Sequence, residues 1–136
     1  LLSSANLPES STLFLALGKR VFTKLLVLVP GETAAPGTAT GKTGTPQTQS
    51  VWGPFDVTVI AVDENWYPVR GVNHMIQLTS NDPSFTTVGN VQMANGTATF
   101  TGVYFGNEGT WTITATSVDD PTKTGTSSPV RVVVPQ

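Results

Sequence analysis

The chain of 136 residues contains no cysteine and a single histidine, and only 12% of its residues are charged. Without cysteine it can form no disulfide, thiolate nucleophile or cysteine-ligated metal site. Seven Lys and Arg are scattered along the chain against nine Asp and Glu, so the basic stripe that binds nucleic acid is missing. The longest apolar runs, residues 13–17 and 25–29, are far shorter than the roughly 20 residues of a membrane helix. We therefore expect neither a nucleic-acid partner nor insertion into a membrane.

Residues suited to catalysis are equally scarce. His74 is the one histidine, and no serine stands in the Gly-x-Ser-x-Gly pattern of hydrolases. A general base needs a nucleophile and an orienting partner, and a histidine at the start of a strand is more often packed or solvated. We expect that the protein is not an enzyme.

Residues that favour β-strands are abundant. The chain has 22 Thr and 17 Val, which are branched at Cβ and suit pleated strands, while 13 Gly and 10 Pro interrupt them. No segment shows the 3.6-residue period of an amphipathic helix. Strands are expected at residues 24–29, 55–63, 74–80, 85–88, 91–93, 97–104, 109–117 and 130–134. Seven or more short strands separated by turns predict an all-β sandwich.

The alternation within these strands predicts which side chains are buried. Val57, Val59 and Ala61 alternate with other residues and therefore share one face of their strand. Asn95-Gly96, between two strands, is the preferred sequence of a two-residue hairpin turn. The predicted core consists of Leu26, Val57, Val59, Ala61, Ile76, Leu78, Phe100, Trp111, Ile113, Val132 and Val134.

Residues 1–22 form a predicted N-terminal extension, and residues 23–136 form the sandwich domain. Within the extension, residues 12–17 have the composition of a strand with apolar side chains on both faces. Three roles stay open for this segment: an edge strand of its own domain, a remnant of a preceding repeat, or a donor strand for a neighbouring subunit. The residues expected to contact that subunit are Leu13, Phe14, Leu15 and Leu17. Residues 33–54 are long for a bare loop, so part of them is expected along a sheet edge.

Three stretches carry a family pattern: LLVLVPGETAAPG at 25–37, VTVIAVDENWYPV at 57–69 and GTWTITAT at 109–116. They resemble bacterial immunoglobulin-like domains of the invasin and intimin type, and the resemblance covers residues 23–135. It implies an immunoglobulin-like β-sandwich of about seven to nine strands. It also implies a secreted, extracellular or cell-surface location, since such modules are mostly spacers, stalks or adhesive tips. Related domains often join a first-strand lysine to a last-strand Asn or Asp; Lys24 is suitably placed, but residues 130–134 offer no acceptor.

Acidic side chains occur in two predicted turns: Asp63, Glu64 and Asn65 in one, Asp119 and Asp120 in the other. In an immunoglobulin-like sandwich these two connections lie at the same end. Their oxygen atoms are of the kind that Ca²⁺ prefers, so the five residues are candidate ligands for calcium as a cofactor. Asp and Asn also begin turns by accepting bonds from their own backbone, an alternative that needs no metal, and no EF-hand spacing is present.

Aromatic side chains follow the first acidic turn. Trp66 and Tyr67 form a candidate contact surface for a carbohydrate or a host protein, whereas Trp52 is expected to pack in the core or at a sheet edge. The favoured function is a non-catalytic structural module of a bacterial surface protein or filament, one that self-assembles through its N-terminal strand. Its partners would be copies of itself or neighbouring domains. An adhesion or carbohydrate-binding module and an accessory domain of a secreted enzyme are the alternatives.

Overall fold

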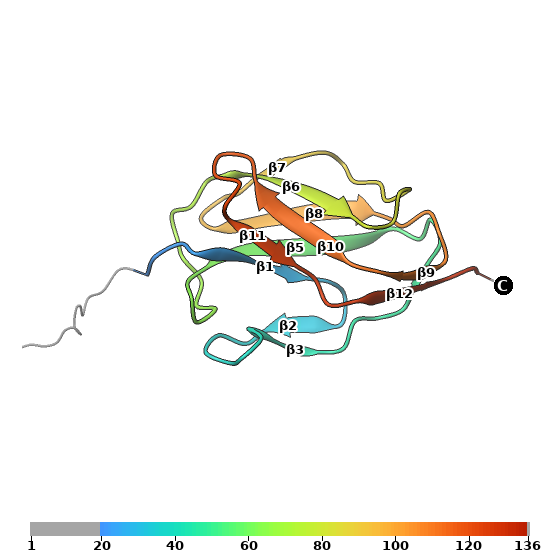
Figure 1. Cartoon of the computed structure of the whole chain (residues 1–136), viewed down its shortest axis with the longest axis horizontal. Helices are drawn as coiled ribbons and strands as arrows, with labels where there is room; N and C mark the ends of the chain where they lie inside the picture. The colour runs from blue at the N-terminus through green and yellow to red at the C-terminus, as the bar shows by residue number, and fades with distance from the viewer. Residues whose placement is uncertain (1–19, 136) are drawn as a thin grey trace, which may run out of the picture.

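The computed structural model describes residues 20–135, and none of these residues is helical (Figure 1). The all-β prediction is therefore confirmed for this part of the chain. Its strands are β1 (Lys24–Leu28), β2 (Glu32–Ala34), β3 (Lys42–Gly44), β4 (Gln49–Ser50), β5 (Phe55–Val62), β6 (Met75–Ser80), β7 (Val91–Gln92), β8 (Thr97–Val103), β9 (Gly109–Trp111), β10 (Ile113–Ser117), β11 (Thr124–Thr126) and β12 (Val130–Val133).

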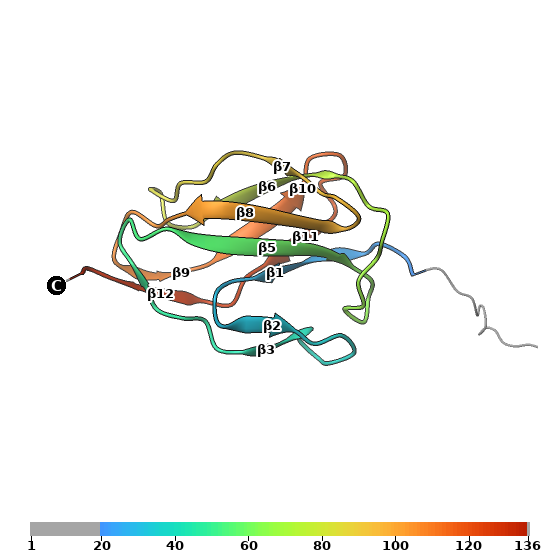
Figure 2. The same cartoon turned by 180° about the vertical axis from the view of Figure 1, so that it is seen from behind.

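Two groups of strands face each other. In one sheet β5 lies between β1 and β8, and the sheet opposite has the order β11, β10, β6 and β7. A smaller sheet joins β4, β12 and β9, in which β4 and β12 run parallel. Figure 1 shows β10 and β11 in front of β5 and β8, and Figure 2 shows the same strands from behind. This arrangement is consistent with a β-sandwich.

The core lies between these layers, where the predicted alternation places it. On β5 the side chains of Val57, Val59 and Ala61 are fully buried, while Asp56 beside them is exposed. All the predicted core residues except Trp111 and Val134 are buried. The Asn95-Gly96 turn is also confirmed: both residues have positive φ, and Ala94 pairs with Thr97 across it.

Three predictions about strands and their ends are wrong. Trp111 is only half-buried against the core, because it stands at the end of β9, where regular pairing stops before β10 begins. Val134 is 52% exposed, because β12 ends one residue earlier and the chain leaves the sheet. Residues 85–88 form no strand, and only Thr86 pairs with Tyr104 in an isolated bridge. The described strands also number more than seven to nine, because residues 109–117 divide into β9 and β10 and the 33–54 connection contains short strands.

The connection before β5 covers a second apolar surface. Leu26 of β1 and Val62 of β5 are buried, although alternation points them away from the core side chains of their strands. The hairpin β2–β3 lies against β1 there, and its Lys42 Nζ donates a 2.9 Å hydrogen bond to the Val27 carbonyl oxygen. The same connection then supplies β4, which pairs with β12. The prediction that part of it follows a sheet edge is thus confirmed.

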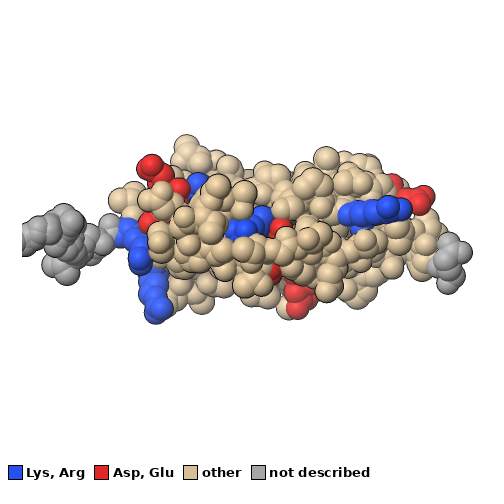
Figure 3. All heavy atoms as spheres, turned by 90° about the horizontal axis from the view of Figure 1, so that it is seen from below, with Lys and Arg blue, Asp and Glu red and all other residues tan. Residues whose placement is uncertain are grey.

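Charged side chains are sparse on the surface. On the face drawn in Figure 3 they occur singly or in small groups among uncharged residues. Within residues 20–135 the structure has no helix that could cross a membrane.

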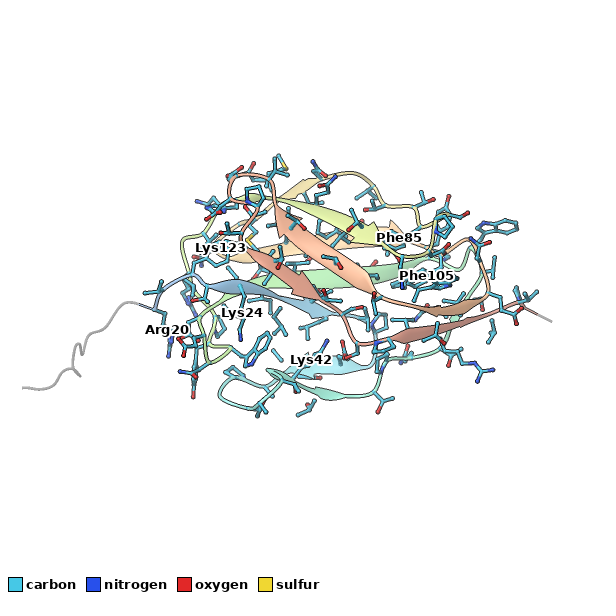
Figure 4. All side chains as sticks on the ribbon, viewed as in Figure 1. Arg20, Lys24, Lys42, Phe85, Phe105 and Lys123 are labelled. Carbon is cyan, nitrogen blue, oxygen red and sulfur yellow. The ribbon has the colours of Figure 1, made fainter. Side chains whose placement is uncertain are left out.

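The chain enters and leaves the sandwich at opposite ends. Arg20 lies at one end, which we call the N-terminal pole, and the chain leaves beyond β12 at the other, the C-terminal pole (Figures 1 and 4). The predicted strand at 12–17, with Leu13, Phe14, Leu15 and Leu17, lies outside the described residues.

Candidate functional site

The first acidic turn, at the N-terminal pole, is held by one carboxylate. Asp63 Oδ1 accepts hydrogen bonds from the backbone amides of Asn65, at 2.8 Å, and Tyr67, at 2.9 Å. Its other oxygen lies 3.7 Å from Arg20 Nε. Glu64 and Asn65 are exposed at the tip of the turn. Asp63 therefore performs the backbone-bonding role that aspartate commonly has in turns.

The second acidic turn is built in the same way. The Thr122 hydroxyl and amide donate to Asp120 Oδ1 at 2.6 and 3.2 Å, and these bonds hold the pKa of Asp120 below its usual value. Figure 1 shows both turns at the N-terminal pole, as the sequence predicts. However, no group of three or more acidic or histidine side chains within residues 20–135 is arranged to hold a metal. Calcium binding by Asp63, Glu64, Asn65, Asp119 and Asp120 stays a prediction.

Trp66 fastens the tip of the β2–β3 hairpin. Its indole Nε1 donates a 3.2 Å hydrogen bond to the Ala39 carbonyl oxygen. Lys24 Nζ lies 3.6 Å from the centroid of the indole, a cation–π contact. Gly41 is buried directly against the same ring, because a Cβ built there would lie 2.4 Å from an indole carbon. The half-buried indole thus has contacts inside the domain, and ligand binding through it stays a prediction.

Tyr67 and Arg20 fix the place where the chain enters the domain. The Arg20 guanidinium carbon lies 4.8 Å from the centroid of the Tyr67 ring, and the Tyr67 hydroxyl lies against Gly37 of the hairpin loop. Two residues further on, Phe22 meets the His74 ring edge-on at 5.2 Å. Figure 4 shows Arg20, Lys24 and Lys123 gathered at this pole. These contacts hold the first described residues against the domain.

A glycine substitution tests the docking of the hairpin on Trp66. Gly41 and Gly71 have nearly the same φ, +78° and +81°, but only Gly41 has atoms close to its missing Cβ. We expect Gly71→Ala to lower the free energy of unfolding by about 1 kcal/mol through backbone strain alone. Gly41→Ala adds a clash with the indole and should lower it by about 2–4 kcal/mol. Urea unfolding checks this, and equal losses in the two variants would mean that the tip is not docked.

His74 is bonded to a buried serine. Its Nδ1 lies 2.8 Å from the hydroxyl oxygen of Ser117, which is fully buried and also accepts the Asp120 amide at 3.0 Å. The imidazole therefore ties the start of β6 to the end of β10. This is the packed role that the sequence favours for His74.

Sequence reasoning missed a buried carboxylate. Asp82 is almost completely buried, and its two oxygens accept four hydrogen bonds. The donors are the Ser84 amide at 3.0 Å, the Asn107 side-chain amide at 2.7 Å, and the amides of Gly106 at 2.9 Å and Asn107 at 3.3 Å. Burial raises the pKa of Asp82, but the four hydrogen bonds together lower it by more. The pKa of Asp82 therefore lies below its ordinary value.

Trp52, like Trp111, differs from its predicted place. It is 70% exposed rather than packed at a sheet edge. Its φ of 62° is the left-handed conformation, which costs a non-glycine residue about 1–2 kcal/mol. Gly53 N donates to the Ser50 carbonyl oxygen at 2.9 Å, so Trp52 occupies the third position of a tight turn, where Gly or Asn is usual.

The chain matches no protein-family model, and no curated protein or solved structure is significantly similar to it.

Proposed function

We propose that this chain is a non-catalytic structural module of a bacterial cell-surface protein or filament. One observation carries the proposal: the chain enters at the N-terminal pole and leaves at the C-terminal pole (Figure 1). A domain with this geometry adds its own length to any array in which it is repeated. The contacts of Arg20 with Asp63 and Tyr67 support it, because they hold the first described residue at that pole.

The strand order supports an immunoglobulin-like version of the sandwich. The first described strand, β1, pairs with β5 in one sheet. The chain then crosses over, and β4 pairs in parallel with the last strand, β12. The second sheet places β6 between β10 and β7. Together with the sequence resemblance, this order favours the family whose modules serve as stalks and spacers. The extracellular location and the self-assembly through residues 12–17 belong to the same proposal.

A tandem of two copies tests the spacer function. We expect two copies joined directly, Pro135 to Arg20, to give a maximum dimension in small-angle X-ray scattering close to twice that of one copy. The physical reason is that each copy begins and ends at opposite poles. A single copy carrying a flexible tail of equal length is the control for chain length. A tandem whose two domains lie side by side, with little gain in maximum dimension, would refute the proposal.

A further inference from the structure

Trp52 has two energetically unfavourable features, and neither contributes to the packing of the domain. The residue is in the left-handed conformation, and its large apolar side chain is 70% exposed. Trp66 has the same kind of backbone, with φ of 72°, but its indole bonds to Ala39 and contacts Lys24. Among residues 20–135 no comparable hydrogen bond or cation–π contact involves the Trp52 indole. A strained residue that the fold does not need indicates a functional position.

The backbone around Trp52 is held firmly. The Trp52 amide donates to the Phe105 carbonyl oxygen at 2.8 Å, and the Val51 amide donates to the Val133 carbonyl oxygen at 2.9 Å. The Phe105 ring is fully buried between the rings of Phe55, at 5.4 Å, and Phe85, at 5.3 Å. An aromatic side chain on a rigid support loses little conformational entropy when it binds, which is why such residues dominate interfaces.

A second exposed apolar residue stands near the same end of the domain. Because β4 and β12 run parallel, with Ser50 opposite Val133, both strands end at the C-terminal pole. Trp52 stands two residues beyond β4, and Val134, 52% exposed, stands one residue beyond β12. We call Trp52 and Val134 the C-terminal patch.

We infer that the C-terminal patch of one copy binds the apolar segment of residues 13–17 of the next copy in an end-to-end array. This inference rests on the proposed function, because an array places the N-terminal pole of each copy at the C-terminal pole of its neighbour. Residues 13–17 adjoin that pole in sequence, and the segment offers Leu13, Phe14, Leu15 and Leu17 to the patch. The occupant is thus a part of this same chain.

Chain length prevents Leu15, the middle of the segment, from reaching the patch of its own copy. β5 separates the two poles by its eight residues, roughly 23 Å at the usual rise of a strand. Lys24 pairs with Val62 at one end of β5, and Trp52 lies three residues before the other end. Leu15 stands five residues before Arg20 and reaches at most about 18 Å from it. Arg20 itself lies beyond Lys24, so Leu15 cannot contact Trp52 of the same copy.

The test measures self-association of the full chain by sedimentation velocity over a range of concentrations. Trp52→Gly removes the indole and the backbone strain together, so we expect this variant to be at least as stable to heat as the wild type. Its association should nevertheless weaken at least about tenfold, the effect of losing an aromatic anchor. Val88→Ala is the matched control, since Val88 is 61% exposed in the connection between β6 and β7 and should leave association unchanged.

A competing peptide identifies the occupant. An excess of a synthetic peptide of residues 11–19 should dissociate the assembly of the full chain, and the same peptide carrying Leu15→Asp should not. The inference is overturned if the full chain stays monomeric, if Trp52→Gly associates like the wild type, or if the peptide has no effect. Saturable binding of an oligosaccharide that depends on Trp52, without self-association, would also overturn it. In the tandem the two copies are joined covalently, so its scattering does not depend on the C-terminal patch. The spacer function and the inference about the patch can therefore each be refuted without the other.

Discussion

Replacing Lys42 with Met is expected to lower the free energy of unfolding by about 3–5 kcal/mol, the usual cost of removing one member of a buried ion pair. The Lys42 Nζ lies 3.1 Å from Glu32 Oε1, and the two side chains are only 11% and 2% exposed. Glu32 also accepts the Val29 amide at 3.1 Å and the Ser128 hydroxyl at 2.8 Å. Without the ammonium group, the carboxylate would remain buried with its charge uncompensated.

A double-mutant cycle separates this effect from simple loss of packing. The combination Glu32→Gln with Lys42→Met removes both charges, and it should recover much of the stability that Lys42→Met loses. Arg131→Met, at an exposed position of β12, should change the free energy of unfolding by less than about 0.5 kcal/mol. Urea unfolding measures all of these proteins. A loss below about 1 kcal/mol in Lys42→Met would show that the pair is not buried in solution.

Replacing Asp82 with Asn should lower the free energy of unfolding by about 2–4 kcal/mol at neutral pH, because four donors surround the carboxylate. An amide offers one acceptor oxygen, and its NH₂ group would meet other N–H groups. Asp56→Asn is the matched control: Asp56 is exposed and accepts one bond, from Gly102 at 3.2 Å, so its loss should stay below about 1 kcal/mol.

The Asp82 effect should also depend on pH. Because folding lowers the pKa of Asp82 below 3.8, the carboxylate contributes stability above the unfolded pKa. That contribution disappears as the pH falls through the folded pKa. The difference between the wild type and Asp82→Asn should therefore be constant near neutral pH and shrink below about pH 4. A difference that does not change between pH 7 and strongly acidic conditions would contradict the assigned role.

Local patterns made the longer strands predictable. The alternation of Val57, Val59 and Ala61 places them in the core, and Asn95-Gly96 forms the hairpin turn, because both features depend on neighbouring residues only. The burial at the ends of β9 and β12 was not predictable in this way, since Trp111 is the last paired residue of β9 and Val134 lies one residue beyond β12.

Several contacts that hold the loops in place involve residues distant in sequence. Glu32 meets Ser128 across 96 residues, and Asp82 meets Asn107 across 25. The position of Trp66 in a turn predicts an exposed side chain, but a second loop 27 residues earlier folds over it. No periodic pattern reports that one loop covers another. The exposure of Trp52 follows likewise from the end of β4 beside β12, which only the assembled sheets reveal.

The path of the chain also determines how the domain responds to mechanical tension. A pull between Arg20 and Pro135 acts along the strands, whereas the hydrogen bonds that join β1 to β5 and β4 to β12 lie across that direction. Bonds loaded in this way share the force and break together rather than one after another. If β1 slides free, the tension reaches residues 32–44, which straighten to at most about 45 Å. The ion pair of Glu32 and Lys42 joins the two strands of this hairpin. It must therefore break before residues 32–44 can extend under tension.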